Sequence, residues 1–198
     1  MHHKLSRILA ASVLGSALLS GATTASADAT GAMVSNPCAG CHGIEGASQG
    51  QAPVIAGLSQ MYLASTMKAY RDGQRYATIM DRIAKGYTDA QIDAMSGHFA
   101  NIGWPTNNQT VDADQAAKGQ KLHTSSGCAG CHGATGVSMM PNAPRLAGQY
   151  AGFLEQQMHD YKDAAKAIPP GAMVMRSMLA AMSDEDIAAL AAFYASQK

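Results

Sequence analysis

The chain is poor in aromatic residues and in cysteine for its length of 198 residues. Phe, Trp and Tyr make up 6% of it, with a single Trp, and there are four Cys. Structural disulfide frameworks belong to small chains that are dense in cysteine, so this cysteine content argues against one. The shortage of aromatic rings also limits the apolar surface that a small domain of this composition can bury.

The chain also lacks an excess of positive charge. It has 14 Lys and Arg residues against 14 Asp and Glu. Residues 28–198 keep 12 of the basic and all 14 of the acidic residues, which gives them a formal charge of −2. A nucleic-acid-binding protein needs a basic patch or stripe to neutralise phosphates. We therefore expect no nucleic acid partner.

Long apolar runs are missing beyond the first 27 residues. No later segment approaches the roughly 18 apolar residues that a membrane-spanning helix needs. Residues 1–27 have the three parts of a secretory signal: basic Lys4 and Arg7, an apolar stretch from Ile8 to Leu19, and small residues ending at Ala27. We predict a signal peptide over residues 1–27, cleaved after Ala27, and a periplasmic protein with no membrane span; an uncleaved membrane anchor is the alternative.

What the chain does contain is the same five-residue motif twice. Cys-Ala-Gly-Cys-His occurs at Cys38–His42 and again at Cys128–His132, and these copies hold all four cysteines. Cys-x-x-Cys-His is the attachment motif of c-type haem. One helical turn brings residues three apart onto a common face, where both sulfurs can bond the vinyl groups of one haem. We predict two covalently bound haem c groups, each with a proximal histidine on its iron: Cys38, Cys41 and His42 for the first, and Cys128, Cys131 and His132 for the second.

Other roles for paired cysteines fit this sequence less well. A zinc ribbon separates its two cysteine pairs by about 15–20 residues, much less than the spacing found here. A thioredoxin-like pair would lie among alternating strands and helices, and no two-residue hydrophobic alternation runs long enough to predict a strand. Neither a dithiol nor a disulfide explains the histidine that follows both pairs.

The internal repeat extends well beyond the two motifs. Ala52–Gly57 matches Ala143–Gly148 residue by residue at four of six positions. A helical stripe with steps of four and three follows in each half. Its members are Leu63, Met67 and Tyr70 in the first half and Leu154, Met158 and Tyr161 in the second.

A capped last helix completes each half. Thr88–Gln91 and Ser183–Asp186 are predicted to form capping boxes, with apolar residues following at i, i+3 and i+7.

Residues 104–111 contain Pro, Asn and Thr and are predicted to form an ordered or semi-ordered linker. Asp112 or Asp114 is then expected to cap a helix that runs to about His123. We predict an all-α fold of two tandem domains, 28–103 and 112–198, each wrapped around one haem.

A methionine is the expected sixth ligand of each iron, since His/Met ligation is typical of electron-transfer cytochromes. When the last helices are aligned through Ile92 and Ile187, Met80 corresponds to Met175. Both follow an aliphatic residue and lie in a loop-like stretch before the last helix, so we predict Met80 and Met175 as ligands. Met173 and Met178 are the next candidates for the second haem, and the paired Met67 and Met158 are expected to pack in the core.

Histidine and proline offer further candidates around each iron. His98, His123 and His159 could give bis-histidine ligation, but none has a counterpart in the other half, so we expect them to be packed or on the surface. A proximal histidine usually donates its second ring N–H to a carbonyl. The carbonyls of Pro53 and Pro144, in the loops after the motifs, are predicted to accept these bonds; a simple turn is the alternative.

The motifs together resemble class I cytochrome c domains, and two in tandem after a signal peptide resemble the cytochrome c4 family. A narrower resemblance is to the cytochrome subunit of flavocytochrome c sulfide dehydrogenase, at Thr78–Tyr87, Lys121–His123 and Phe193–Gln197. In that family an FAD subunit oxidises sulfide and the haems carry the electrons away. The second half departs from it toward the ordinary c4 pattern.

Electron transfer without bond chemistry is the expected function. Two His/Met irons are six-coordinate and leave no position for a substrate, and the chain has neither a phosphate-binding loop nor a flavin-binding glycine fingerprint. The chain is therefore predicted not to be an enzyme. The rival class is a dihaem enzyme, such as a peroxidase or a thiosulfate-oxidising cytochrome, with ligand exchange in the Met-rich second loop after Pro169-Pro170-Gly171.

The resemblance implies two possible settings for electron transfer. In the first, the chain is the cytochrome subunit of a flavoprotein sulfide dehydrogenase, with the first domain docking on the flavoprotein and the second haem passing electrons to another redox protein. The charged neighbours of Met80, which are Asp81, Arg82 and Lys85, are then expected at the interface. In the second setting, the chain is a free c4-type shuttle to a terminal oxidase.

Overall fold

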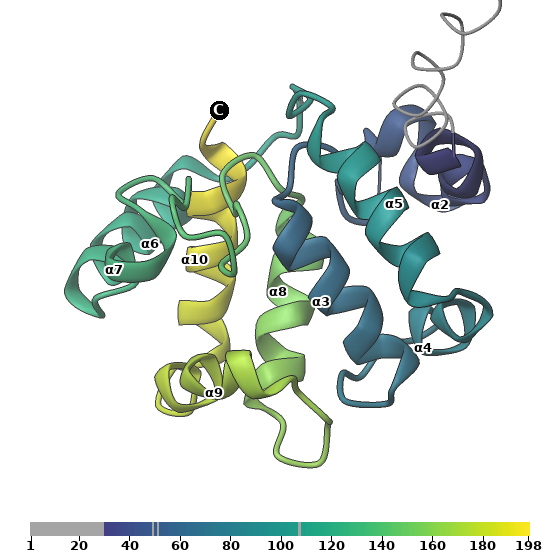
Figure 1. Ribbon diagram of the computed structural model, residues 1–198. Helices are drawn as coiled ribbons and strands as arrows, with labels where there is room; N and C mark the ends of the chain where they lie inside the picture. Colours follow the sequence, from purple (N-terminus) through teal and green to yellow (C-terminus); the bar gives the residue numbers. More distant parts are fainter. Residues whose placement is uncertain (1–29, 49, 51, 107) are drawn as a thin grey trace, which may run out of the picture.

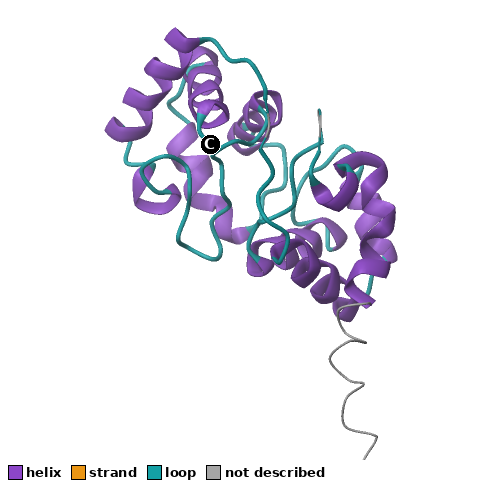
Figure 2. Cartoon of the chain, turned by 90° about the horizontal axis from the view of Figure 1, so that it is seen from above, coloured by secondary structure: helices purple, strands orange, loops and turns teal. Residues whose placement is uncertain are grey.

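The computed structural model describes residues 30–48, 50, 52–106 and 108–198. The predicted signal peptide, residues 1–27, lies outside these residues. Every regular element of the described residues is helical, with no strand among them, as Figure 2 shows. The predicted all-α fold is confirmed.

Each half contains the predicted series of helices. In the first half, residues 30–35 are helical and are followed by η1 (Asn36–Cys38), α2 (Ala39–His42), η2 (Ile44–Gly46), α3 (Gln60–Arg71), α4 (Met80–Ile83), η3 (Ala84–Gly86) and α5 (Asp89–Ala100). The second half contains α6 (Ala113–Ser125), α7 (Ala129–His132), α8 (Ala151–Lys162), η4 (Pro170–Ala172), α9 (Met173–Leu179) and α10 (Asp184–Ser196). In Figure 1 the two halves stand next to each other, with α3 and α8 facing the junction between them.

Side chains cap the helices where the sequence predicts. The Thr88 hydroxyl accepts from the Gln91 N–H at 3.3 Å, and the Gln91 side chain accepts from the Thr88 N–H at 2.9 Å, which completes the capping box of α5. Ser183 and Asp186 form the same box on α10. Asp112, and not Asp114, caps α6, and that helix continues to Ser125.

Matching glycines close the loop after each haem motif. Gly46 and Gly136 have φ angles of 75° and 88°, which favour glycine. The carbonyl of each accepts two backbone hydrogen bonds from the loop that follows, from Ile55 and Ala56 in the first half and from Leu146 and Ala147 in the second. A Cβ on Gly136 would lie 2.7 Å from the Tyr194 ring, so the loop packs directly on α10. The repeat in sequence is thus a repeat in three dimensions.

The two cores form around the last helix of each half. In the second half α10 packs on α6 and α8, and its apolar face joins Leu154, Met158 and Leu179 in one buried cluster. Gly119 allows α6 to approach α10 closely, because a Cβ there would lie 2.0 Å from the Ala189 carbonyl oxygen. In the first half α3 packs on α5 and contributes to a smaller cluster of Leu58, Leu63 and Phe99.

The side-chain amide of Gln149 joins the two halves through two hydrogen bonds to the main chain of Val54. The Gln149 side chain accepts from the Val54 N–H at 3.0 Å and donates to the Val54 carbonyl at 2.9 Å. The Tyr150 hydroxyl donates to the Ser48 carbonyl at 2.6 Å. The linker takes part as well, since the Gln109 side chain donates to the Gln149 carbonyl at 2.8 Å. These bonds hold the loops that follow the two haem motifs against each other.

Candidate functional site

Both Cys-x-x-Cys-His motifs form one-turn helices. Each motif begins at the N-cap cysteine of α2 or α7 and ends at the histidine in the last position of that helix. Cys38 and Cys128 are half-buried, whereas Cys41 and Cys131 are exposed, and all four are free thiols. Each half therefore presents two sulfurs and one imidazole from a single turn, which is the arrangement that covalent haem attachment requires.

The ring orientation of both proximal histidines is fixed by a carbonyl. His42 Nδ1 lies 2.8 Å from the Pro53 carbonyl oxygen, and His132 Nδ1 lies 3.4 Å from that of Pro144. A carbonyl can only accept, so Nδ1 carries the proton and donates it. Nε2 of each ring then keeps its lone pair for a metal.

Burial also favours the neutral imidazole in both halves. It lowers the pKa of His42 and of His132 below the ordinary value, although the hydrogen bonds to the proline carbonyls act in the opposite direction. The neutral ring is the form that binds iron.

The two predicted methionine ligands lie on short helices, and the predicted loop-like stretch is wrong in this detail. Met80 is the first residue of α4, and Met175 is the third residue of α9. Both side chains are half-buried. Helix α4 packs on α3 and α9 packs on α8, so each methionine is carried by an element anchored on the central helix of its half.

The competing methionines are less buried or belong to the core. Met173 and Met178 are 52% and 37% exposed, whereas Met175 packs against the second-half core cluster. Met158 is a buried member of that cluster, as expected, while Met67 is only half-buried. The assignment of Met80 and Met175 as iron ligands stays a prediction.

Each of the three histidines without a counterpart in the other half has a contact of its own. His123 is 1% exposed, with Nδ1 2.9 Å from the Tyr194 hydroxyl and Nε2 2.9 Å from the Gly133 carbonyl oxygen. Both of its ring nitrogens are therefore engaged in bonding the second haem motif to α10. His98 stacks edge-on against Phe99, and His159 lies 3.8 Å from Asp184.

The partnership of His123 with Tyr194 is a feature that the sequence reasoning missed. The aligned partners of Tyr194 and His123 in the first half are not a tyrosine and a histidine, so the repeat gave no signal for this bond. The only available signal was the position of His123 five residues before Cys128.

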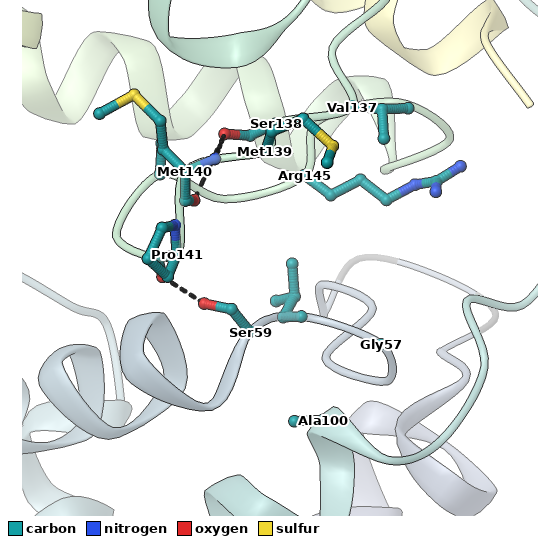
Figure 3. Close-up of a pocket in the computed structure, with 11 residues that line it drawn as sticks. Gly57, Ser59, Ala100, Val137, Ser138, Met139, Met140, Pro141 and Arg145 are labelled. Carbon is teal, nitrogen blue, oxygen red and sulfur yellow. Dashed lines mark hydrogen bonds between the residues drawn. The ribbon is translucent and has the colours of Figure 1, made fainter.

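An open cleft of about 360 Å³ lies between the halves, away from the predicted ligands. Figure 3 shows Ser59 of the first half donating to the Pro141 carbonyl of the second across its edge. The loop of Val137–Ala143 lines one side, with Met139 93% exposed. None of the predicted haem-binding residues lines this cleft.

The residues present fit a covalent haem in each half. The thiols are free, each imidazole keeps one nitrogen for the iron, and a methionine is carried on a short helix in each half. No group of three His, Cys, Asp or Glu side chains in the described parts of the chain could hold a metal ion. The iron ligands offered here are instead one histidine and one methionine per half.

A model of the family described as "Cytochrome c" matches the chain twice, over residues 28–102 and 116–198. The chain belongs to the cytochrome c family. The two matches coincide with the two Cys-x-x-Cys-His halves, so this cytochrome carries two covalent haem c groups. It is an electron-transfer protein of the two-domain, cytochrome c4-like kind.

Proteins with two kinds of name are similar to this cytochrome over most of its length. The chain is 27% identical to "Cytochrome c4" of Pseudomonas aeruginosa over 163 residues, 79% of this chain and 81% of that protein. It is 31% identical to the "Thiosulfate dehydrogenase electron acceptor" of Thiomonas intermedia over 172 residues, 81% and 78% of the two chains. The crystal structure of reduced recombinant cytochrome c4 from Pseudomonas stutzeri superposes with a TM-score of 0.77 at 25% identity, covering 87% of this chain and 98% of that one.

The narrower resemblance to a sulfide dehydrogenase subunit holds over part of the chain. The "Cytochrome subunit of sulfide dehydrogenase" of Chlorobaculum tepidum is 37% identical over 75 residues, which is 38% of this chain and 68% of that protein. The c4-like identity therefore applies to the whole cytochrome, whereas the sulfide dehydrogenase likeness applies to one segment. None of the helices in the described part of the chain has the length and apolar character needed to cross a membrane.

Proposed function

We propose that this cytochrome accepts single electrons from a periplasmic dehydrogenase of reduced sulfur compounds and passes them to another redox protein, such as a cytochrome or a terminal oxidase. The observation that carries this is its likeness to proteins named for that role, over 172 residues for the thiosulfate enzyme's acceptor and over 75 for the sulfide enzyme's subunit. Each haem iron supplies a one-electron change between the ferric and ferrous states. His42 with Met80, and His132 with Met175, would hold the two irons.

The first candidate donor is an FAD-containing sulfide dehydrogenase subunit docked on the first domain. This follows from the resemblance at Thr78–Tyr87, the segment that contains Met80. In the structure the same segment presents Ile79 and Ile83, which are 46% and 41% exposed, beside the exposed charges of Arg82 and Lys85. An apolar centre with a charged rim is the usual anatomy of a protein interface.

The three charged residues predicted at the docking surface differ in exposure and in their hydrogen bonds. Lys85 is exposed, and Arg82 is exposed but donates to the Thr78 carbonyl at 2.6 Å. Asp81 is half-buried, and its Oδ1 is buried with no partner among the described residues. Lys85 is therefore the site at which a charge reversal tests docking without disturbing the Met80 segment.

A thiosulfate dehydrogenase is the second candidate donor. The likeness to the Thiomonas intermedia acceptor extends over both domains, which the sulfide dehydrogenase likeness does not. A c4-type shuttle that serves several donors is the remaining setting, and it matches the whole-chain likeness to cytochrome c4.

Reduction assays with defined donors distinguish these settings. The oxidised two-haem cytochrome is mixed with sulfide and a flavoprotein sulfide dehydrogenase subunit, or with thiosulfate and a thiosulfate dehydrogenase, and haem reduction is followed by absorbance. We expect Lys85→Glu to slow the productive reaction several-fold, because a charge at the rim of an interface changes the association rate. Lys121→Glu, the same change at an exposed position of α6 in the second domain, is the matched control.

The outcomes separate the proposals. Fast reduction in the first mixture supports the sulfide pathway, and fast reduction in the second supports the thiosulfate pathway. Slow reduction in both contradicts the sulfur dehydrogenase role and favours the free shuttle. If Lys85→Glu and Lys121→Glu slow haem reduction equally, the donor does not dock specifically at the Met80 segment.

Periplasmic export has its own test. Sequencing of the N-terminus of the exported protein should find Asp28 as the first residue.

A further inference from the structure

A glutamine of the second half reaches the loop that holds the proximal histidine of the first. Gln149 lies just before α8 and is 3% exposed. Its side-chain oxygen accepts from the Val54 N–H at 3.0 Å, and its side-chain nitrogen donates to the Val54 carbonyl at 2.9 Å. Val54 is itself completely buried, so its N–H depends on Gln149 for a partner.

The orientation of the Gln149 amide is fixed by the groups around it. Oε1 faces a second donor, the Tyr150 N–H at 3.1 Å, while Nε2 faces the Val54 carbonyl, which can only accept. The main chain of Gln149 is held as well, because its N–H donates to the Leu146 carbonyl at 3.0 Å and its carbonyl accepts from the Gln109 side chain at 2.8 Å. Gln149 Oε1 is therefore a fixed acceptor for the Val54 N–H.

The Val54 N–H belongs to the same peptide group as the Pro53 carbonyl. That carbonyl oxygen lies 2.8 Å from His42 Nδ1 and accepts its proton. Hydrogen bonds in series polarise one another, so a peptide group whose N–H donates to an acceptor carries more negative charge on its oxygen. Gln149 thus acts on His42, the predicted proximal ligand of the other half, through two hydrogen bonds and one peptide group.

The second half has no reciprocal arrangement. Its corresponding peptide group joins Pro144 to Arg145, and the Arg145 N–H donates to no residue in the described part of the chain. The distance from His132 Nδ1 to the Pro144 oxygen is 3.4 Å. In the repeat, Leu58 of the first half stands where Gln149 stands in the second, and a leucine side chain cannot accept a hydrogen bond. The half whose peptide N–H is bonded therefore has the shorter bond to its histidine.

We propose that Gln149 is a positioning residue for the haem of the other half: by accepting from the Val54 N–H, it strengthens the bond from His42 to the Pro53 carbonyl and lowers the potential of the first haem. A stronger acceptor draws the Nδ1 proton away from the ring without removing it. The imidazole then donates more electron density to its iron, which favours the ferric state. The inference rests on the predicted ligation by His42 and not on the identity of the electron donor.

Redox titration of Gln149→Met and Tyr150→Phe tests the proposal, with each haem followed by proton NMR through the signals of its own axial ligands. Gln149→Met keeps an unbranched side chain but removes both bonds to Val54, so we expect it to raise the potential of the first haem and to leave the second unchanged. Tyr150→Phe is the matched control, because it removes the neighbouring bond between the halves, to the Ser48 carbonyl, and leaves the Val54 N–H bonded. We expect it to change neither potential.

The competing explanation is that Gln149 only holds the halves together. In that case Gln149→Met lowers the melting temperature, as Tyr150→Phe does, and the potential of the first haem stays where it was. That result would overturn the proposal. A shift of equal size in both haems, or the same shift of the first haem in Tyr150→Phe, would overturn it too, because the potentials would then follow the packing of the halves and not the bond to Val54.

Gln149→Asn keeps the test valid if Gln149→Met fails to mature. Asparagine retains the amide but is one methylene shorter, so its oxygen withdraws from the Val54 N–H, and we expect a shift in the same direction. The unchanged ferrous protein gives a further readout, since the Nδ1 proton of His42 should resonate downfield of that of His132. A His42 signal at or upfield of the His132 signal would overturn the proposal. So would His42 ring protons without the upfield shift that a bound haem produces, because His42 would then not be the ligand.

Discussion

A histidine that ligates iron needs its second ring nitrogen held, and a main-chain carbonyl does this in both halves of the cytochrome. The distance from His42 Nδ1 to the Pro53 oxygen is 2.8 Å, and the corresponding distance from His132 to Pro144 is 3.4 Å. The shorter bond makes the imidazole a stronger electron donor to its iron.

At the residue scale, the methionine ligands can be tested directly. We expect Met80→Ala and Met175→Ala each to convert one haem to another spin or ligand state and to lower its potential, because a thioether ligand favours ferrous iron. The readouts are the absorption band characteristic of methionine-ligated ferric haem and a potentiometric titration of both haems.

Met139→Ala is the control for the methionine variants. Met139 is 93% exposed and distant in sequence from both predicted ligands. Its removal should leave both haem spectra unchanged. A normal spectrum and potential in Met175→Ala would contradict that assignment and make Met173 or Met178 the next candidate.

At the element scale, each half depends on close packing between the helix before its haem motif and its last helix. Helix α6 precedes the second haem motif and crosses α10 at Gly119, where the backbones approach too closely for a side chain. Residues 30–35 make a related contact in the first half, where a Cβ on Gly31 would lie 2.8 Å from the Ala94 carbonyl oxygen. The helix before each haem motif is thereby tied to the last helix of the same half.

We expect Gly119→Ala to destabilise the second half by about 1–3 kcal/mol or more, since the added methyl group would overlap the Ala189 carbonyl. Thermal denaturation followed at the haem absorbance measures this. Gly152→Ala in α8 is the control, because a Cβ there meets no atom within 4 Å. The control should be neutral or stabilising by up to about 1 kcal/mol, as expected for alanine in a helix. Equal melting temperatures for the two variants would contradict the close crossing.

At the scale of the whole molecule, each half has its own core cluster, and hydrogen bonds join the two halves. The larger core cluster consists only of second-half residues, and the smaller consists only of first-half residues and Trp104 at the start of the linker. Gln149, Tyr150, Arg75 and Ser59 are among the residues that make hydrogen bonds between the halves. Each half is therefore expected to hold its haem without the other.

Cys38→Ser combined with Cys41→Ser tests that expectation. We expect an exported protein that carries one covalent haem, measured by its mass and by the haem-to-protein ratio, with the second domain still folded. The reciprocal variant, Cys128→Ser with Cys131→Ser, is the control for the other half. Loss of both haems from a protein that still reaches the periplasm would contradict independent domains.

The sequence by itself determined the parts of the cytochrome that depend on neighbouring residues. The haem attachment motifs, the capping boxes at Thr88 and Ser183, and the helical stripes follow from spacings within one or two turns. The all-α fold followed from these periodicities, and the duplication made each assignment testable in the other half.

Only the tertiary structure decided the features that join distant segments. Met80 and Met175 lie in short helices instead of loops because α4 and α9 pack on α3 and α8, and no local pattern announces such packing. The His123–Tyr194 bond spans 71 residues, and Gln149 meets Val54 across 95. The burial of Arg75 could not be predicted from the sequence either, because arginine is usually found at the surface. Burial and long-range hydrogen bonds depend on which surfaces meet, and that is settled only when the two halves fold and pack together.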